Sequence, residues 1–197
     1  MILILQLLIY GIVGAVAWPA FLLAMSKCDT LSYEHAMRDP VTGRRRRDIL
    51  APPAWLFGPV WTIMYGLIIA GMAIYVLKLN DSLIAACCTF QPTWLTTTIL
   101  ALFFANISFN HYWSIVFFRY RSAAFALVIA MLIMITAIAL VVFFAVDGGW
   151  QGWVAFGVFV PYALWSIYAF ILNASFLRAV GERGWRSMEP AAVKPRD

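Results

Sequence analysis

The apolar residues of this 197-residue chain fall into five long blocks, separated by shorter polar or charged segments. Each block has roughly the 20 residues that a helix needs to cross a bilayer. None shows the short alternating pattern of membrane barrel strands. The pattern therefore predicts an all-α integral membrane protein, a bundle of five transmembrane helices. The predicted spans are 2–25, 54–77, 93–118, 123–146 and 152–177.

The composition agrees with a membrane protein. Hydrophobic residues make up 64% of the chain and charged residues 12%, whereas a soluble domain has about 25% charged residues. We expect one membrane domain over residues 1–178, with a basic loop one at 26–52, and then a basic, disordered tail over residues 179–197. The first block is interpreted as a retained span, because it lacks the basic start and the clear cleavage site of a signal peptide.

The charged residues predict the orientation. Thirteen of the fourteen Lys and Arg residues lie in loop one, in the third loop or after the fifth span, and Lys78 alone lies on the other side. The positive-inside rule then predicts an outer N-terminus and a cytoplasmic C-terminus, in a bacterial inner membrane. The run Arg44–Arg47 is interpreted as a topology determinant, with attraction to anionic headgroups as the alternative. A single exposed loop is not a nucleic-acid-binding surface, so we expect no nucleic-acid partner.

Polar and aromatic residues recur at helical spacing in three of the spans, although crossing a membrane does not require them. In the second span, Phe57, Trp61 and Tyr65 recur every four residues and share one face. Trp55 suits the membrane interface, where Trp is enriched. Tyr65 lies about 15 Å deeper along the helix, too far for an interfacial belt.

The third and fifth spans carry similar faces. Asn106, Asn110, Trp113 and Phe117 share one face of the third span. Asn106 is expected to bond a neighbouring helix, whereas for Asn110 ligand binding and helix packing are equal alternatives. The fifth span carries four notable residues at intervals of four, so that they share one helix face. The small Ala among them fits either a slot for a flat ligand or close helix packing. These positions are Pro161, Trp165, Ala169 and Asn173.

The sequence shows no catalytic machinery. No Asp or Glu lies deep in a predicted span, and there is no Ser-His-Asp arrangement or phosphate loop. His111 has no neighbouring carboxylate or second His, and Cys28, Cys87 and Cys88 lack zinc-site spacing. We therefore expect no catalytic residue, no metal and no required cofactor.

Three motifs resemble the TspO/MBR family, the translocator proteins or tryptophan-rich sensory proteins, formerly called peripheral benzodiazepine receptors. The resemblance covers about residues 50 to 178 and includes the order of the motifs and the number of spans. The motifs are Pro52-Pro53-x-Trp55-x-x-Gly58-Pro59-Val60-Trp61-x-x-x-Tyr65, Asn110-x-x-Trp113-x-x-x-Phe117-Phe118, and Pro161-Tyr162-x-x-Trp165 with Leu172-Asn173.

The resemblance implies a five-helix bundle, often a homodimer, that binds porphyrins or haem-type tetrapyrroles, sterols and benzodiazepine-type ligands beneath loop one. The segment Arg47-Asp48-Ile49-Leu50-Ala51 departs from the family, which usually carries Trp just before the Pro-Pro pair. The sterol motif after Asn173 lacks its Tyr, so sterol transport is not predicted. By position, the expected ligand-binding residues are Trp61, Tyr65, Asn110, Trp113, Phe117, Trp165, Ala169 and Asn173.

The leading hypothesis is a membrane-embedded binding protein, sensor or translocator for flat hydrophobic ligands, above all porphyrins and secondarily sterols. The resemblance implies a regulatory role in tetrapyrrole or stress responses. One alternative is light-dependent porphyrin breakdown involving Trp61 and Trp165. Another is a structural membrane-assembly protein without a ligand, in which Ala101 and Ala105 serve a dimer face.

Overall fold

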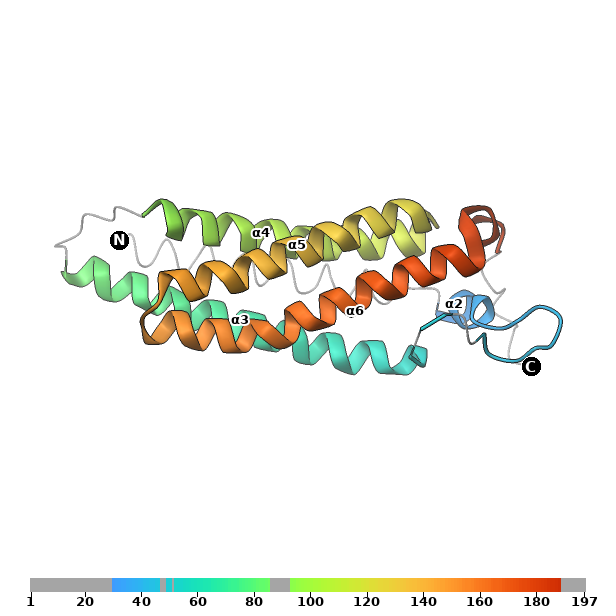
Figure 1. Cartoon of the computed structure of the whole chain (residues 1–197), viewed down its shortest axis with the longest axis horizontal. Coiled ribbons are helices and arrows are strands. Elements are labelled where there is room, and N and C mark those ends of the chain that lie inside the picture. Colours follow the sequence, from blue (N-terminus) through green and yellow to red (C-terminus); the bar gives the residue numbers. More distant parts are fainter. Residues whose placement is uncertain (1–29, 47–48, 51, 86–92, 189–197) are drawn as a thin grey trace, which may run out of the picture.

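The computed structural model describes residues 30–46, 49–50, 52–85 and 93–188, in which long helices dominate (Figure 1). No β-strand occurs in this part of the chain, so the all-α class is confirmed. The elements are α2 (Thr30–Ala36), α3 (Ala54–Ala85), α4 (Trp94–Ser114), the π-helix η1 (Ile115–Arg119), α5 (Ala123–Asp147) and α6 (Gly149–Ser187).

Four of the described helices are long and apolar enough to cross a membrane. They correspond to the second to fifth predicted spans, and the predicted first span at 2–25 lies outside the described residues. The spanning segments are Trp55–Val76, Trp94–Arg119, Ala123–Asp147 and Gly149–Ser187.

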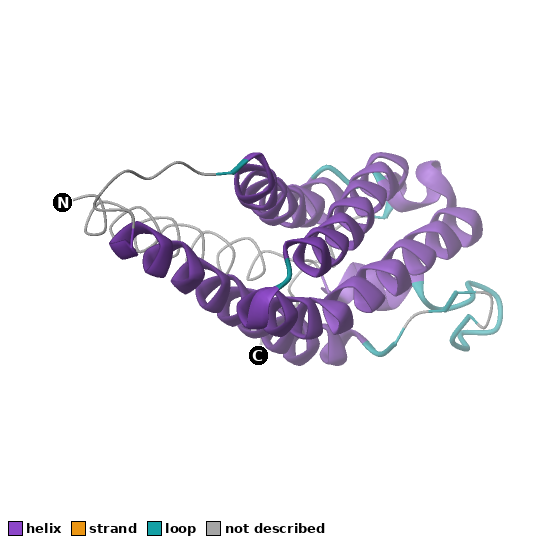
Figure 2. Ribbon diagram, turned by 60° about the vertical axis from the view of Figure 1, so that its left-hand side comes forward, coloured by secondary structure: helices purple, strands orange, loops and turns teal. Residues whose placement is uncertain are grey.

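Consecutive long helices run in opposite directions along the chain (Figure 1), and together they form one elongated bundle (Figure 2). α5 lies against both α4 and α6, and α6 also packs on α3. Along α5, Ala126, Ile133 and Leu140 are buried against these neighbours, whereas Val128 and Ile135 are exposed. A helix that is apolar on both its buried and its exposed faces suits a bilayer, where lipid covers the outer face.

Local sequence sets the helix ends. α3 begins directly after Pro53, at a helix start where a missing N–H costs nothing. The Thr93 and Ser122 hydroxyls accept hydrogen bonds from the first turns of α4 and α5. α5 ends at Asp147 and is capped by Gly148, whose φ of 63° favours glycine. The predicted disordered tail is wrong for residues 179–187, which continue α6 to Ser187.

Exposed aromatic residues lie near both ends of the bundle. Trp55 and Tyr120 lie at the end that carries α2, and Trp94, Trp150 and Trp153 lie at the opposite end; all are more than half exposed. Trp and Tyr favour the two membrane interfaces because their rings are apolar and their tips are polar. The exposure of Trp55 fits its predicted role as an interfacial anchor.

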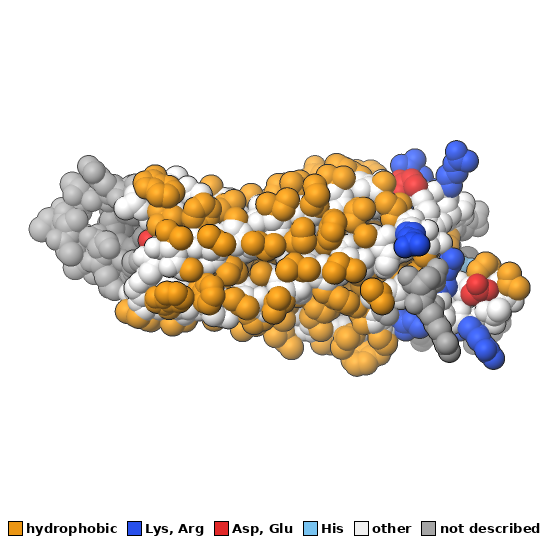
Figure 3. All heavy atoms as spheres, in the orientation of Figure 1, with side chains coloured by type: hydrophobic (Ala, Val, Ile, Leu, Met, Phe, Trp, Pro, Cys, Tyr) orange, Lys and Arg blue, Asp and Glu red, His pale blue; other side chains and the backbone are white. Residues whose placement is uncertain are grey.

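The charged side chains gather at the α2 end. Figure 3 shows an apolar middle, with the visible Lys and Arg side chains beyond it at this end. Loop one, η1 and the end of α6 supply them, so these segments lie on the same side as the charge pattern predicted. The bundle therefore has the outline of a membrane protein with one basic end.

The chain after α2 forms a tight hairpin in this basic end. The Arg46 amide donates to the Met37 carbonyl at 2.8 Å, next to an Arg38–Arg45 bridge. At the tip, the Asp39 carboxylate accepts hydrogen bonds from the amides of Thr42 and Val41 at 2.8 and 2.9 Å. These bonds lower the pKa of Asp39. Loop one is thus folded against itself before it reaches α3.

The α5–α6 turn requires a glycine at position 152. A Cβ there would lie 2.9 Å from the Phe144 carbonyl oxygen, and backbone cannot move aside cheaply. We expect Gly152→Ala to lower the free energy of unfolding by about 1–3 kcal/mol, as overpacking does. Gly157 in the same helix has no atom within 4 Å of its added Cβ. Gly157→Ala should therefore leave stability unchanged or raise it by up to about 1 kcal/mol.

Titration with SDS in mixed micelles, followed by circular dichroism, measures both variants. Equal midpoints for Gly152→Ala and Gly157→Ala would show that the close contact at the turn carries no cost.

Candidate functional site

A cavity of about 280 Å³ lies between the long helices, beneath α2. Side chains from α2, α3, α4, η1, α5 and α6 all reach it. All the ligand-binding residues predicted from the sequence are in its wall. The wall consists of Tyr33, Trp55, Phe57, Gly58, Trp61, Tyr65, Asn110, Trp113, Ser114, Phe117, Phe118, Ala130, Ile133, Trp165, Ser166, Tyr168, Ala169, Leu172 and Asn173.

Aromatic rings from α3 and α6 form one side of this cavity. The four-residue spacing of α3 turns Phe57, Trp61 and Tyr65 toward it. The Trp61 ring stacks on Tyr65 with centroids 5.5 Å apart. It also meets the Trp165 ring of α6 edge-on at 6.3 Å. This side therefore offers broad ring faces to a flat molecule.

On α6, Ala169 provides space and Asn173 ties two helices together. The Asn173 amide donates to the Ala169 carbonyl at 2.8 Å. Its side-chain oxygen accepts from the Trp113 indole N–H of α4 at 3.1 Å. Both polar ends of Asn173 are therefore engaged within the protein, and it orients Trp113 as part of the wall.

Asn110 belongs to a buried polar network at the base of the cavity. Its amide donates to the Tyr162 hydroxyl at 2.7 Å, and Tyr162 donates to the Asn106 side-chain oxygen. The Asn106 amide donates to the Ile133 carbonyl at 3.0 Å and to Thr136 at 2.7 Å. The structure thus shows the interhelical bond predicted for Asn106. Asn110 packs helices through Tyr162 and also lines the cavity, so the packing alternative is confirmed and ligand binding stays a prediction.

The roof of the cavity is Tyr33, which α2 holds in place. The Tyr33 ring stacks on Phe176 at 6.1 Å and meets Phe57 edge-on at 5.7 Å. One further contact ties loop one to α6, and another is made within loop one. The Tyr168 hydroxyl donates to the Leu50 carbonyl at 2.8 Å, and the Arg45 guanidinium donates to the Pro52 carbonyl at 2.7 Å. Loop one therefore covers the cavity, as the family resemblance implied.

Two donors in the wall have no hydrogen-bond partner among the described residues. They are the Tyr33 hydroxyl and the Trp165 indole N–H, and both atoms are buried. Burial also raises the pKa of Tyr33, so the hydroxyl keeps its proton. Buried donors rarely stay unpaired in native structures, so both atoms are available to an acceptor.

Sequence reasoning missed part of this wall. Tyr33 lies outside the spans and carries no motif, so only its packing places it here. Tyr168 was detectable, since it follows Trp165 by three residues on the same helical face. Ala130 and Ile133 come from a span with no chemical signal at all. In the described part of the chain, no group of three His, Cys, Asp or Glu residues is placed to hold a metal ion.

Removing the Tyr33 hydroxyl is expected to affect stability and porphyrin affinity in opposite directions. Tyr33→Phe removes an unpaired buried donor, so stability without ligand should stay equal or rise by up to about 1 kcal/mol. The same change should weaken binding of a carboxylate-bearing porphyrin about 10- to 100-fold, because one hydrogen bond to a charged group, worth about 1.5–3 kcal/mol, is lost. Thermal unfolding and fluorescence titration measure the two effects.

Phe57→Leu is the matched control for Tyr33→Phe, because it changes the neighbouring ring without touching a donor. If Tyr33→Phe lowers stability and leaves affinity unchanged, the hydroxyl has a structural partner and no ligand function.

Sequence comparisons identify related proteins over most of the chain. The TspO/MBR family matches residues 15–178, which include the whole cavity wall. The chain is 29% identical over 127 residues to the tryptophan-rich protein TspO of Archaeoglobus fulgidus, covering 64% of this chain and 71% of the relative. It is 29% identical over 165 residues to the tryptophan-rich sensory protein of Cereibacter sphaeroides, covering 82% of this chain and 91% of the relative.

Proposed function

Because the chain belongs to the TspO/MBR family and is a multi-pass integral membrane protein, we propose that its cavity binds a flat hydrophobic ligand of the porphyrin class. The protein then acts as a sensor or translocator for that ligand. The proposal includes a regulatory role in tetrapyrrole or stress responses, which the family resemblance implies.

The observation that carries the proposal is a set of rings on three helices around one cavity. Trp61 and Tyr65 come from α3, Trp113 from α4 and Trp165 from α6. Each buried aromatic side chain contributes about 150–250 Å² of contact area, and offset stacking suits a planar partner. Broad ring faces with few polar groups favour a planar macrocycle over a branched aliphatic ligand.

Charge favours a porphyrin over a sterol. The roof of the cavity lies at the basic end of the bundle, where Arg38 and Arg44 are exposed. Cations attract the carboxylates of a porphyrin during approach and at the cavity mouth. A sterol carries one neutral hydroxyl and gains little from this field. Cholesterol is therefore the matched neutral competitor.

Titration of the purified protein with protoporphyrin, haem and cholesterol tests the proposal. We expect saturable quenching of Trp fluorescence by protoporphyrin at micromolar concentration or below, and weaker binding of cholesterol. Absence of saturable porphyrin binding to the folded protein would contradict it, and would favour the structural membrane-assembly alternative. Under illumination, faster loss of bound porphyrin than in Trp165→Phe would support the light-dependent alternative.

The orientation and assembly form part of the same proposal. We place the α2 end in the cytoplasm of a bacterial cell, because the described basic residues gather there. Trypsin should then cut loop one in inverted membrane vesicles and spare it in right-side-out vesicles. We also propose a homodimer, whose mass in detergent distinguishes it from a monomer.

A further inference from the structure

The end of α6 folds back onto the bundle as a separate short segment. Gly181 has φ 74° and ψ 160°, a non-helical conformation that interrupts α6 and that only glycine adopts easily. The residues after it, Glu182–Ser187, form a last turn that we call the latch. The latch makes two kinds of contact, polar and aromatic, with different parts of the bundle.

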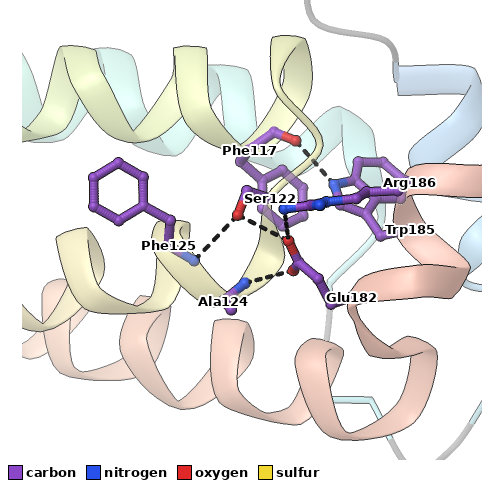
Figure 4. A network of polar contacts seen from close by, with 7 residues as sticks. All are labelled: Phe117, Ser122, Ala124, Phe125, Glu182, Trp185 and Arg186. Atoms are coloured by element: carbon purple, nitrogen blue, oxygen red, sulfur yellow. Dashed lines mark hydrogen bonds and ion pairs between the residues drawn. The ribbon is translucent and has the colours of Figure 1, made fainter.

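The polar contact of the latch is made by Glu182, whose carboxylate bonds groups at the start of α5. Its carboxylate accepts hydrogen bonds from the Ser122 hydroxyl at 2.9 Å and from the Ala124 amide at 2.8 Å (Figure 4). Arg186 pairs with the same carboxylate at 2.8 Å. A carboxylate at a helix N-terminus satisfies open amides and interacts favourably with the helix dipole. Glu182 therefore fixes the start of the latch.

The aromatic contact is Trp185, which is fully buried at 0% exposure. Its indole N–H donates to the Phe117 carbonyl at 2.9 Å (Figure 4). Its ring packs on Phe117 at 5.1 Å and on Phe176 at 5.2 Å. The Arg121 guanidinium lies over the face of the Trp185 ring, 5.3 Å from the ring centroid and within cation–π range. Trp185 thus holds the latch closed through Phe117.

Phe117 also belongs to the cavity wall. It lies in the π-helix η1, near a helix end where the last carbonyls have no partner within the helix. Its ring stacks on Trp113 with centroids 5.2 Å apart and planes 13° apart. Trp113, Phe117 and Trp185 therefore form a continuous stack from the cavity to the latch.

The size of the cavity indicates that a wall must move when a porphyrin binds, and the contacts around it indicate which one. At about 280 Å³ it is just below the range of roughly 300–1,000 Å³ typical for drug-sized ligands. A porphyrin macrocycle therefore needs a wall to move outward. The base at Asn106, Asn110 and Tyr162 is tied by several buried hydrogen bonds. The Phe117 side is closed by a short segment beyond a glycine break, which makes it the easier wall to displace.

We propose that the latch reports occupancy of the cavity: a bound macrocycle displaces Phe117, loosens Trp185 and releases residues 182–187. The proposal rests on porphyrin binding for its ligand and on the Phe117 contact for its mechanism. By linkage, the factor by which bound macrocycle favours release of the latch equals the factor by which release of the latch tightens binding. A variant with a loosened latch therefore binds the macrocycle more tightly.

The experiment has an arm with porphyrin and an arm without it. In the first, trypsin cleavage after Arg183 and Arg186 is followed in the full-length protein with and without saturating protoporphyrin. We expect cleavage to accelerate about tenfold, a typical size for coupling between sites. Trp185→Phe, which keeps an aromatic ring of smaller size and removes the indole donor, should bind protoporphyrin several-fold more tightly. Trp153→Phe, an exposed Trp at the start of α6, is the matched control and should change neither result.

The arm without porphyrin compares Phe117→Leu with Trp61→Ala. Both change the cavity wall, but Phe117 touches the latch and Trp61 lies on the α3 side. Faster cleavage in Phe117→Leu, with no change in Trp61→Ala, would support the link between Phe117 and the latch even if porphyrin does not bind. Failure of porphyrin to bind would then overturn the proposed ligand and not the link. Equal cleavage in the two variants, or no change with bound porphyrin, would overturn the latch proposal.

Discussion

Replacing both Trp61 and Trp165 with alanine is expected to weaken porphyrin binding by at least about 100-fold. The two rings meet edge-on at 6.3 Å, and together they form the aromatic side of the cavity. Loss of a central aromatic contact typically costs about 2 kcal/mol or more, and each 1.4 kcal/mol is tenfold in affinity. Isothermal titration of the purified variant in detergent measures the change.

The matched control is Trp94→Ala with Trp150→Ala. Both of these residues are exposed near the opposite end of the bundle, away from the cavity. This control should keep wild-type affinity, although it loses the same number of Trp rings. If the Trp61 and Trp165 variant stays folded and binds porphyrin as tightly as wild type, the cavity is not the ligand site.

Asn106→Leu is expected to lower the free energy of unfolding by about 2–3 kcal/mol. The substitution removes donors to Ile133 and Thr136 and an acceptor for Tyr162. Each hydrogen bond between membrane helices contributes about 0.6–2 kcal/mol. Thr136 keeps its bond to the Leu132 carbonyl at 2.7 Å, which limits the loss. Reversible unfolding by SDS in mixed micelles measures the difference.

Ser108→Ala is the matched control on the same helix. Ser108 is exposed and its hydroxyl bonds only locally, to the Phe104 carbonyl at 2.8 Å. Its loss should change stability by less than about 0.5 kcal/mol. Similar unfolding midpoints for Asn106→Leu and Ser108→Ala would mean that the buried network does not join the helices.

The helices were largely predictable because the bilayer imposes a simple rule. A span must be apolar over about 20 residues, and the observed spans begin and end close to the predicted limits. The exceptions are the end of α3, which continues to Ala85, and the end of α6, which continues to Ser187. Hydropathy stops at the membrane surface, and the contacts that order this end come from Ser122 and Phe117, which lie about 60 residues earlier in the chain.

The candidate site was predictable where chemistry recurs at helical spacing. Trp61, Tyr65, Asn110, Trp113, Phe117, Trp165, Ala169 and Asn173 carry such a signal, and all of them line one cavity. Spacing shows which residues share a face of one helix, but not which faces of different helices meet. Ala130 and Ile133 were therefore invisible in a uniformly apolar span.

The sequence alone determined the fold class, the described spans, the basic end and the faces that carry aromatic and amide side chains. Each of these depends on local composition or on the 3.6-residue helical period, which can be read along the chain. Only the tertiary structure decided that Tyr33 forms the roof and that Asn173 orients Trp113. It alone decided that Trp185 closes the far side of Phe117. Each of these contacts joins residues distant in sequence, and they form only when the helices pack.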